Sequence, residues 1–193
     1  MAINPILSTG PLAGRRRSSA TRCRAVAEYT SLWGWTVDLD GLRLGPGSGP
    51  AEVRAAWLTR PQAQVRLLTG HGFDVLTVPE QAGCQALVRA ERMGLRPGPV
   101  LAADGSAHFF VTEGTAAELP KLLYRAGWDG AELDLTGRGV GASVPVPPSP
   151  TARWLRPPTP ESVLRPPEPQ PLLSALAYAA HTGTRALMLS CST

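Results

Sequence analysis

The stretch LLTGHGFDVLTVPEQAG, residues 67–83, decides how the fold is read. It holds two short apolar runs separated by the turn GHG at residues 70–72, a pattern typical of adjacent strands. The segment EQAGCQALVRAERMG that follows has apolar residues at the three- and four-residue spacing of a helix. We therefore expect a buried strand that leads directly into a helix. Asp74 and Thr77 lie on this strand and raise the question of an active site.

Outward from this stretch, short helices alternate with strands that pair locally. The segment WTVDLDGLRL predicts a hairpin with Asp40-Gly41 at its turn, and GPVLAADGSAHFFV predicts another with Asp104-Gly105 at its turn. The segment AELDLTGRGVGASVPVPPS predicts two strands around a glycine-rich turn. This order of elements predicts an α+β fold, or an α/β fold with an incompletely parallel mixed sheet, over residues 21–182.

The segments toward the two ends differ from this pattern. Residues 1–20 lack apolar periodicity and include three consecutive arginines, so we expect a flexible basic arm. Residues 145–171 are so rich in proline that we expect an extended loop or polyproline segment, anchored by Trp154. A closing amphipathic helix is expected over residues 171–182, followed by a tail at 183–193.

Composition and charge narrow the class of protein only in part. The chain has 19 basic and 15 acidic residues and a net charge of +4, which permits an anionic partner without requiring one. Its 3 cysteines are far apart, so neither a disulfide framework nor a zinc site is indicated. The sequence has no apolar run of about 20 residues and no phosphate-binding GxxxxGK loop. We expect a cytoplasmic protein without helicase activity.

Polar residues inside apolar strands mark the candidate site, because a buried polar group without a partner is costly. Ser106 and His108 fall on one face of the strand SAHFFV by alternation, and Asp134 lies in LDL. If these two strands are neighbours, the three side chains converge. Each residue also has an ordinary explanation, as a satisfied core histidine or as an aspartate that begins a turn.

An ordered set of short motifs identifies a family resemblance. A helix followed by GW and a strand leads to LLTG-G-F-V, then to G-HFF, then to LDL-G-GVGA and V-PPS, and finally to WLRPP. This set resembles the N-terminal domain of bifunctional DNA primase/polymerases, of the archaeo-eukaryotic primase superfamily, and is most similar to its short actinobacterial members. The resemblance covers residues 22–180.

The resemblance implies a site with three motifs. Ser106 and His108 match the family's Ser-x-His, which contacts the incoming nucleotide, and Asp134 matches the aspartate that completes the metal site. Arg138, in the glycine-rich turn after Asp134, is a further candidate for nucleotide binding. An active member would use Mg²⁺ or Mn²⁺, because two cations must hold the triphosphate and activate the attacking hydroxyl.

The first motif of the family, two aspartates separated by one residue, does not match. Alignment on the glycine turn and on Gly83 places Thr77 and Pro79 at the two aspartate positions. Threonine is a weak neutral ligand, and proline has no ligating side chain. Alternation sends Asp74 to the opposite face of the strand, and Glu80 has the wrong parity as well.

Three functions follow from these matches. The preferred one is a degenerate primase/polymerase that binds nucleotide or nucleic acid with little or no polymerase activity. The first alternative is an active enzyme in which Asp134 and His108 form the metal site with Asp74 or Glu80. The second alternative is a module for protein interaction that uses the proline-rich segment for docking.

Overall fold

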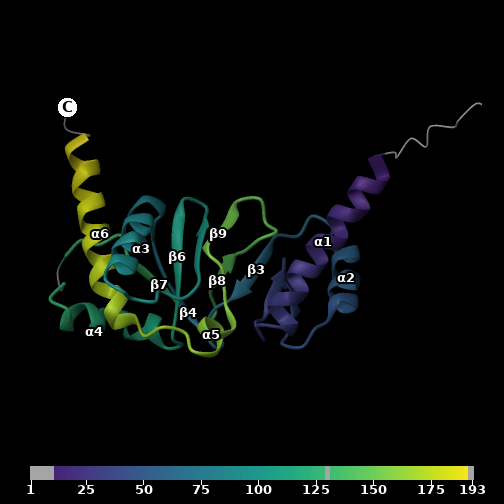
Figure 1. Cartoon of the computed structure of the whole chain (residues 1–193), viewed down its shortest axis with the longest axis horizontal. Helices are drawn as coiled ribbons and strands as arrows, with labels where there is room; N and C mark the ends of the chain where they lie inside the picture. Colours follow the sequence, from purple (N-terminus) through teal and green to yellow (C-terminus); the bar gives the residue numbers. More distant parts are fainter. Residues whose placement is uncertain (1–10, 129–130, 191–193) are drawn as a thin grey trace, which may run out of the picture.

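The chain folds around two antiparallel sheets that lie side by side (Figure 1). The structure is a computed structural model that describes residues 11–128 and 131–190, with side chains for 20–128 and 131–181. The strands are β1 Val37–Leu39, β2 Leu42–Leu44, β3 Val65–Leu68, β4 Asp74–Pro79, β5 Val100–Ala103, β6 Ser106–Val111, β7 Thr136–Arg138, β8 Ser143–Pro145 and β9 Ala152–Arg156. The first sheet has the order β2-β1-β3-β8 and the second has the order β7-β4-β6-β5-β9. The pairs of strands described are antiparallel, which confirms the α+β class.

Helices cover the two sheets separately. They are α1 Pro11–Ser31, α2 Pro50–Thr59, α3 Glu80–Arg92, α4 Thr115–Arg125, α5 Pro160–Leu164 and α6 Pro169–Ser190. Helices α1 and α2 pack on each other beside the first sheet, whereas α3, α4 and α6 cover one face of the second sheet. Figure 1 shows these two groups at opposite ends of the molecule. In the ranges that the structure describes, no helix is long and apolar enough to cross a membrane.

The stretch 67–83 connects the two sheets, which corrects the expectation that its two strands are adjacent. Strand β3 pairs with β1 and β8, whereas β4 pairs with β6 and β7. The chain leaves the first sheet through Gly70 and Gly72, whose φ angles of +80° and +84° suit glycine. The two strands around the later glycine-rich turn, β7 and β8, are likewise in different sheets. The alternation of apolar residues predicts which face of a strand is buried but not which sheet the strand joins, so the sequence could not predict this arrangement.

The two connections between the sheets are bonded to each other. Thr69 donates a backbone hydrogen bond of 3.1 Å to Ala142 and a hydroxyl hydrogen bond of 2.6 Å to the carbonyl of Gly139. A Cβ atom on Gly70 would lie 2.4 Å from the backbone of Val140, so the close approach requires glycine. The connections therefore fix how the two sheets meet.

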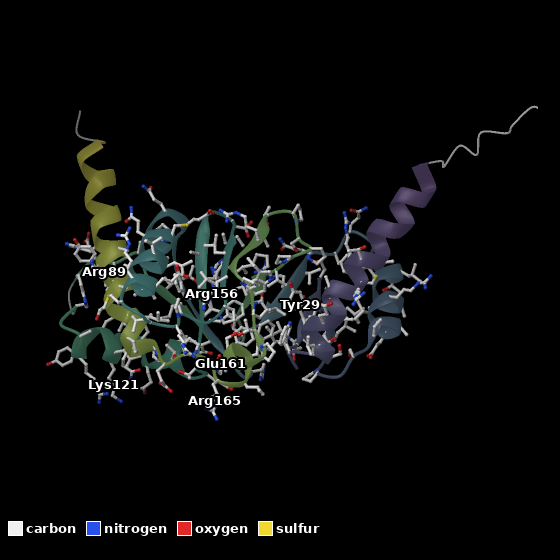
Figure 2. The ribbon with its side chains drawn as sticks, viewed as in Figure 1. Tyr29, Arg89, Lys121, Arg156, Glu161 and Arg165 are labelled. Atoms are coloured by element: carbon white, nitrogen blue, oxygen red, sulfur yellow. The ribbon has the colours of Figure 1, made fainter. Side chains whose placement is uncertain are left out.

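An aromatic cluster fills the space where the sheets meet. The ring centroids of Trp35 and Phe73 are 5.2 Å apart, those of Phe73 and Phe110 are 4.7 Å apart, and those of Phe110 and Trp154 are 5.5 Å apart. Tyr29 extends the cluster from α1, as Figure 2 shows, and donates a hydrogen bond of 2.9 Å to the carbonyl of Pro147. Aromatic rings supply large buried areas, so this cluster is the main apolar link between the sheets.

The proline-rich segment 145–171 is more ordered than the expected extended loop. Residues 152–156 form β9, which pairs with β5 at the edge of the second sheet, and Trp154 packs on Phe110. Prolines flank this strand rather than interrupt it, as expected at a sheet edge. The short helix α5 follows, and Thr159 caps its first turn.

The terminal helices are longer than the sequence pattern predicts. Helix α1 begins at Pro11, inside the expected arm at 1–20, and residues 1–10 lie outside the described residues. Helix α6 runs over 169–190 instead of 171–182, so it includes most of the expected tail. Alanine and leucine in both helices favour continued helix without the periodic apolar face that the prediction required.

Candidate functional site

A line of polar side chains crosses the second sheet on the face opposite α3, α4 and α6. Strand β4 lies between β6 and β7, and Thr77 is the register partner of both His108 and Thr136. Directly paired residues share a face of the sheet. Ser106 and Arg138 fall on the same face by alternation. We call this set the polar face: Thr77, Ser106, His108, Thr136 and Arg138.

Thr77 is the centre of a hydrogen-bond chain on the polar face. Its Oγ1 atom lies 3.0 Å from Nδ1 of His108 and accepts a hydrogen bond of 3.3 Å from Nε of Arg138. A threonine hydroxyl has one proton to donate. Since Arg138 can only donate, Oγ1 is the acceptor in that bond, whereas the direction of its bond with Nδ1 of His108 depends on the tautomer of the imidazole.

His108 is neutral in this environment. Its side chain is 3% exposed, and burial is the largest cause that lowers its pKa to about 4. The positive charges of Arg138 and Arg66 lower the pKa further, against a hydrogen bond to the Ala103 backbone and the charge of Asp104. The fixed positive charge of the polar face therefore comes from arginine and not from the histidine.

Protonation of His108 gives a test of this assignment. The folded pKa lies below the unfolded value of 6.5, so in acid the unfolded chain binds a proton that the folded chain does not. The contribution of His108 to the free energy of unfolding is therefore complete above the unfolded pKa of 6.5. It is lost as the pH falls toward the folded pKa of about 4. Between about pH 7.5 and about pH 4.5 we expect the free energy of unfolding to fall by about 2 kcal/mol more than in His108→Gln. Urea titrations at both pH values measure this difference, and identical losses in the two proteins would contradict the assignment.

Asp74 belongs to the other face of the sheet, as alternation predicts. It is 2% exposed, and its Oδ2 atom accepts a hydrogen bond of 2.8 Å from the backbone of Ala116, in the first turn of α4. A carboxylate here satisfies a free N–H group and complements the helix dipole. Oδ1 has no hydrogen-bond partner among the described residues. Asp74 therefore supports α4 and does not reach the polar face.

Glu80 is also held in a structural contact. It is the first residue of α3, and its carboxylate forms an ion pair with Arg153 of β9. Pro79 precedes it as the N-cap residue of α3 and makes no side-chain hydrogen bond there. Of the residues that the structure describes, no group of three or more His, Cys, Asp or Glu side chains could hold a metal ion.

Asp134 differs most from its expected place. It is exposed and precedes β7, which begins at Thr136, so the predicted strand AELDL does not form around it. Strand β4 separates β7 from β6, so the strands of Asp134 and His108 are not neighbours. The structure therefore links His108 to Thr77, and through it to Arg138, in place of Asp134, while Ser106 shares their face of the sheet.

Arg66 is a nearby charge that the sequence reasoning missed. It lies on β3 of the first sheet, where its Nε donates a hydrogen bond of 2.8 Å to Oγ of Ser143 and a terminal nitrogen donates one of 3.1 Å to the Ser143 carbonyl. It is near enough to His108 to lower the pKa of that side chain. An arginine inside the apolar strand VRLL is the same signal that singled out His108.

The fold and the polar face define an α+β protein with two antiparallel sheets, the second of which carries a buried histidine hydrogen-bonded, through Thr77, to an arginine. Over residues 42–172, well over half of the chain, the sequence matches the family described as "Bifunctional DNA primase/polymerase, N-terminal". The chain belongs to this family. The match includes every residue of the polar face. Comparisons with curated proteins and with solved structures give no match.

The metal ions that this family uses do not fit the residues present. Thr77 and Pro79 are the residues that the family resemblance aligns with the first motif, and the Thr77 hydroxyl is hydrogen-bonded to both His108 and Arg138. Hard divalent cations need several oxygen ligands, preferably carboxylates. Asp74 lies behind the sheet and Glu80 is paired, so neither supplies the missing oxygens.

Proposed function

We propose that the chain is a degenerate primase/polymerase that binds nucleotide or nucleic acid and has little or no polymerase activity. One observation carries this proposal: Arg138 and His108 both engage Thr77, the residue that the family resemblance aligns with a metal-binding aspartate. Nucleotidyl transfer in a two-metal site depends on carboxylates that clamp the cations. Their absence at Thr77 and Pro79 supports loss of the reaction, while the arginines support retention of an anionic ligand.

Nucleotide, or the phosphate backbone of DNA in the cytoplasm, is the ligand that this face best suits. Ser106 and Arg138 are half-buried, so each has polar atoms within reach of solvent. The net charge of +4 also favours an anionic partner. The interaction-module alternative has less support, because residues 152–156 of the proline-rich segment already pair with β5.

A template-extension assay with Mn²⁺ tests the proposal. We expect the unmodified chain to give no product above background, while a fluorescent single-stranded oligonucleotide or dATP still binds in a saturable way. Asp134→Ala is the matched control, since an active enzyme would lose synthesis with this carboxylate. Robust extension that Asp134→Ala abolishes would overturn the proposal in favour of the active enzyme.

A further inference from the structure

We propose that Arg138, supported by Arg66, forms a metal-independent subsite for phosphate on the polar face, with its guanidinium in place of the family's metal ions. The inference rests on the proposed function and names the chemistry by which the ligand is held. It concerns anionic phosphate groups, whether of a free nucleotide or of a nucleic acid backbone.

The orientation of Arg138 leaves its donors available. Nε is used by Thr77, which holds the guanidinium over β4 on the polar face. No described carboxylate forms an ion pair with Arg138 or with Arg66. The two terminal nitrogens of Arg138 carry four N–H groups, and this planar fork matches two phosphate oxygens. Arg138 is therefore the direct contact.

Arg66 contributes charge more than contacts. Its Nε and terminal nitrogens already donate to Ser143 and to Oε1 of Gln64, which hold the side chain in place. It lies on β3 of the first sheet, whereas Arg138 lies on β7 of the second. The positive charges of both arginines, one from each sheet, lower the pKa of His108. Opposite charge is drawn to such a partly desolvated site more strongly than to an open surface.

The same geometry disfavours a divalent cation. A metal ion at the position of Thr77 would lie beside the guanidinium of Arg138, whose Nε is 3.3 Å from Thr77 Oγ1. Two like charges at this separation repel. His108 does not change this, because its Nδ1 is already hydrogen-bonded to Oγ1 of Thr77. The arginine is thus an alternative to the metals and not an addition to them.

Binding of dATP and of inorganic triphosphate, measured by calorimetry with EDTA or with Mg²⁺, tests the inference. We expect both probes to bind in EDTA, with Mg²⁺ giving no gain. Arg138→Gln should weaken binding in EDTA by about tenfold or more, since a charge-assisted hydrogen bond is lost. Arg96→Gln removes the same charge from an exposed ion pair with Glu161 and should leave binding unchanged. Equal binding of both probes assigns the subsite to phosphate, and binding of dATP alone would overturn that assignment.

A second variant keeps the test independent of folding. Thr77→Val preserves the shape of the side chain but removes the anchor of Arg138, so we expect a smaller loss of binding, about threefold to tenfold. Binding that requires Mg²⁺ would overturn the inference and leave the proposed function in place. Binding in EDTA that survives Arg138→Gln would also overturn it, because the anion would then lie elsewhere. Absence of binding in either buffer would remove the proposed function and the inference together.

Discussion

A chain with Thr77→Asp and Pro79→Asp is expected to remain inactive in template extension, and the further change Arg138→Gln is expected to produce metal-dependent synthesis. The two aspartates alone reproduce the first motif of the family. Arg138 then stands beside the first of them, because its Nε is 3.3 Å from Thr77 Oγ1. A carboxylate at a position that is 7% exposed will pair with this guanidinium before it binds a metal.

The effect of Arg138 on metal affinity is large enough to keep the double variant inactive. A charge-assisted hydrogen bond contributes about 1.5–3 kcal/mol, which lowers metal affinity by roughly ten- to a hundredfold. Repulsion between the guanidinium and a divalent cation acts in the same direction. Removal of Arg138 takes away both effects. Pro79→Asp is compatible with folding, because the residue has extended backbone at the N-cap of α3, where aspartate is favoured.

Extension of a primed template with Mn²⁺ measures the result in the unmodified, double and triple proteins. Asp134→Ala in the triple protein is the control, because the family resemblance assigns a metal-binding carboxylate to this residue, two positions before Thr136, the register partner of Thr77. Equal activity of the double and triple proteins would contradict the role given to Arg138. A triple protein without template extension would contradict the view that the first motif and Arg138 alone prevent this chain from polymerising.

The features predicted best from the sequence are those set by local chemistry. The Asp40-Gly41 and Asp104-Gly105 turns form hairpins, with positive φ at each of these residues as such turns require. Alternation also assigned Asp74 and Thr77 to opposite faces, which the contact of Asp74 with Ala116 bears out. Such features depend on residues near one another in the sequence, so a single chain is enough to read them.

The features that could not be predicted depend on contacts between distant segments. Nothing local shows that β3 and β4 join different sheets, because the deciding contacts are those of Thr69 with Gly139 and Ala142. The effect of Arg66, on β3, on the pKa of His108, on β6, also depends on how the two sheets meet. Asp134 was placed on a strand by its flanking leucines, yet β7 begins only at Thr136. The structure places His108 and Ser106 on one face of β6 as alternation predicts, and their role in binding stays a prediction.

Gly83→Ala is expected to destabilise the fold by about 3 kcal/mol, and Ala107→Gly is expected to restore much of that loss. Gly83 is buried in α3, where the helix packs on β6. A Cβ atom on Gly83 would lie 2.2 Å from Cβ of Ala107, far inside the normal contact of about 3.5–4.0 Å between carbon atoms. The gain of about 1 kcal/mol in helix propensity from glycine to alanine is too small to offset this clash.

The compensating change follows from the identity of the clashing atom. The other neighbours of the added Cβ are Val78 at 3.3 Å and Phe109 at 3.4 Å, which need to move by only a few tenths of an ångström. Removal of the Ala107 methyl group therefore opens most of the required space, although glycine in β6 itself costs about 0.5–1 kcal/mol. Exchanging which element carries the methyl group should leave the packing of α3 on the sheet nearly unchanged.

Urea unfolding of the single and double variants measures the coupling between the two positions. Gly45→Ala is the matched control, because nothing lies within 4 Å of a Cβ atom there, and we expect a change within about 0.5 kcal/mol. Additive losses in the double variant would contradict the close contact between α3 and β6.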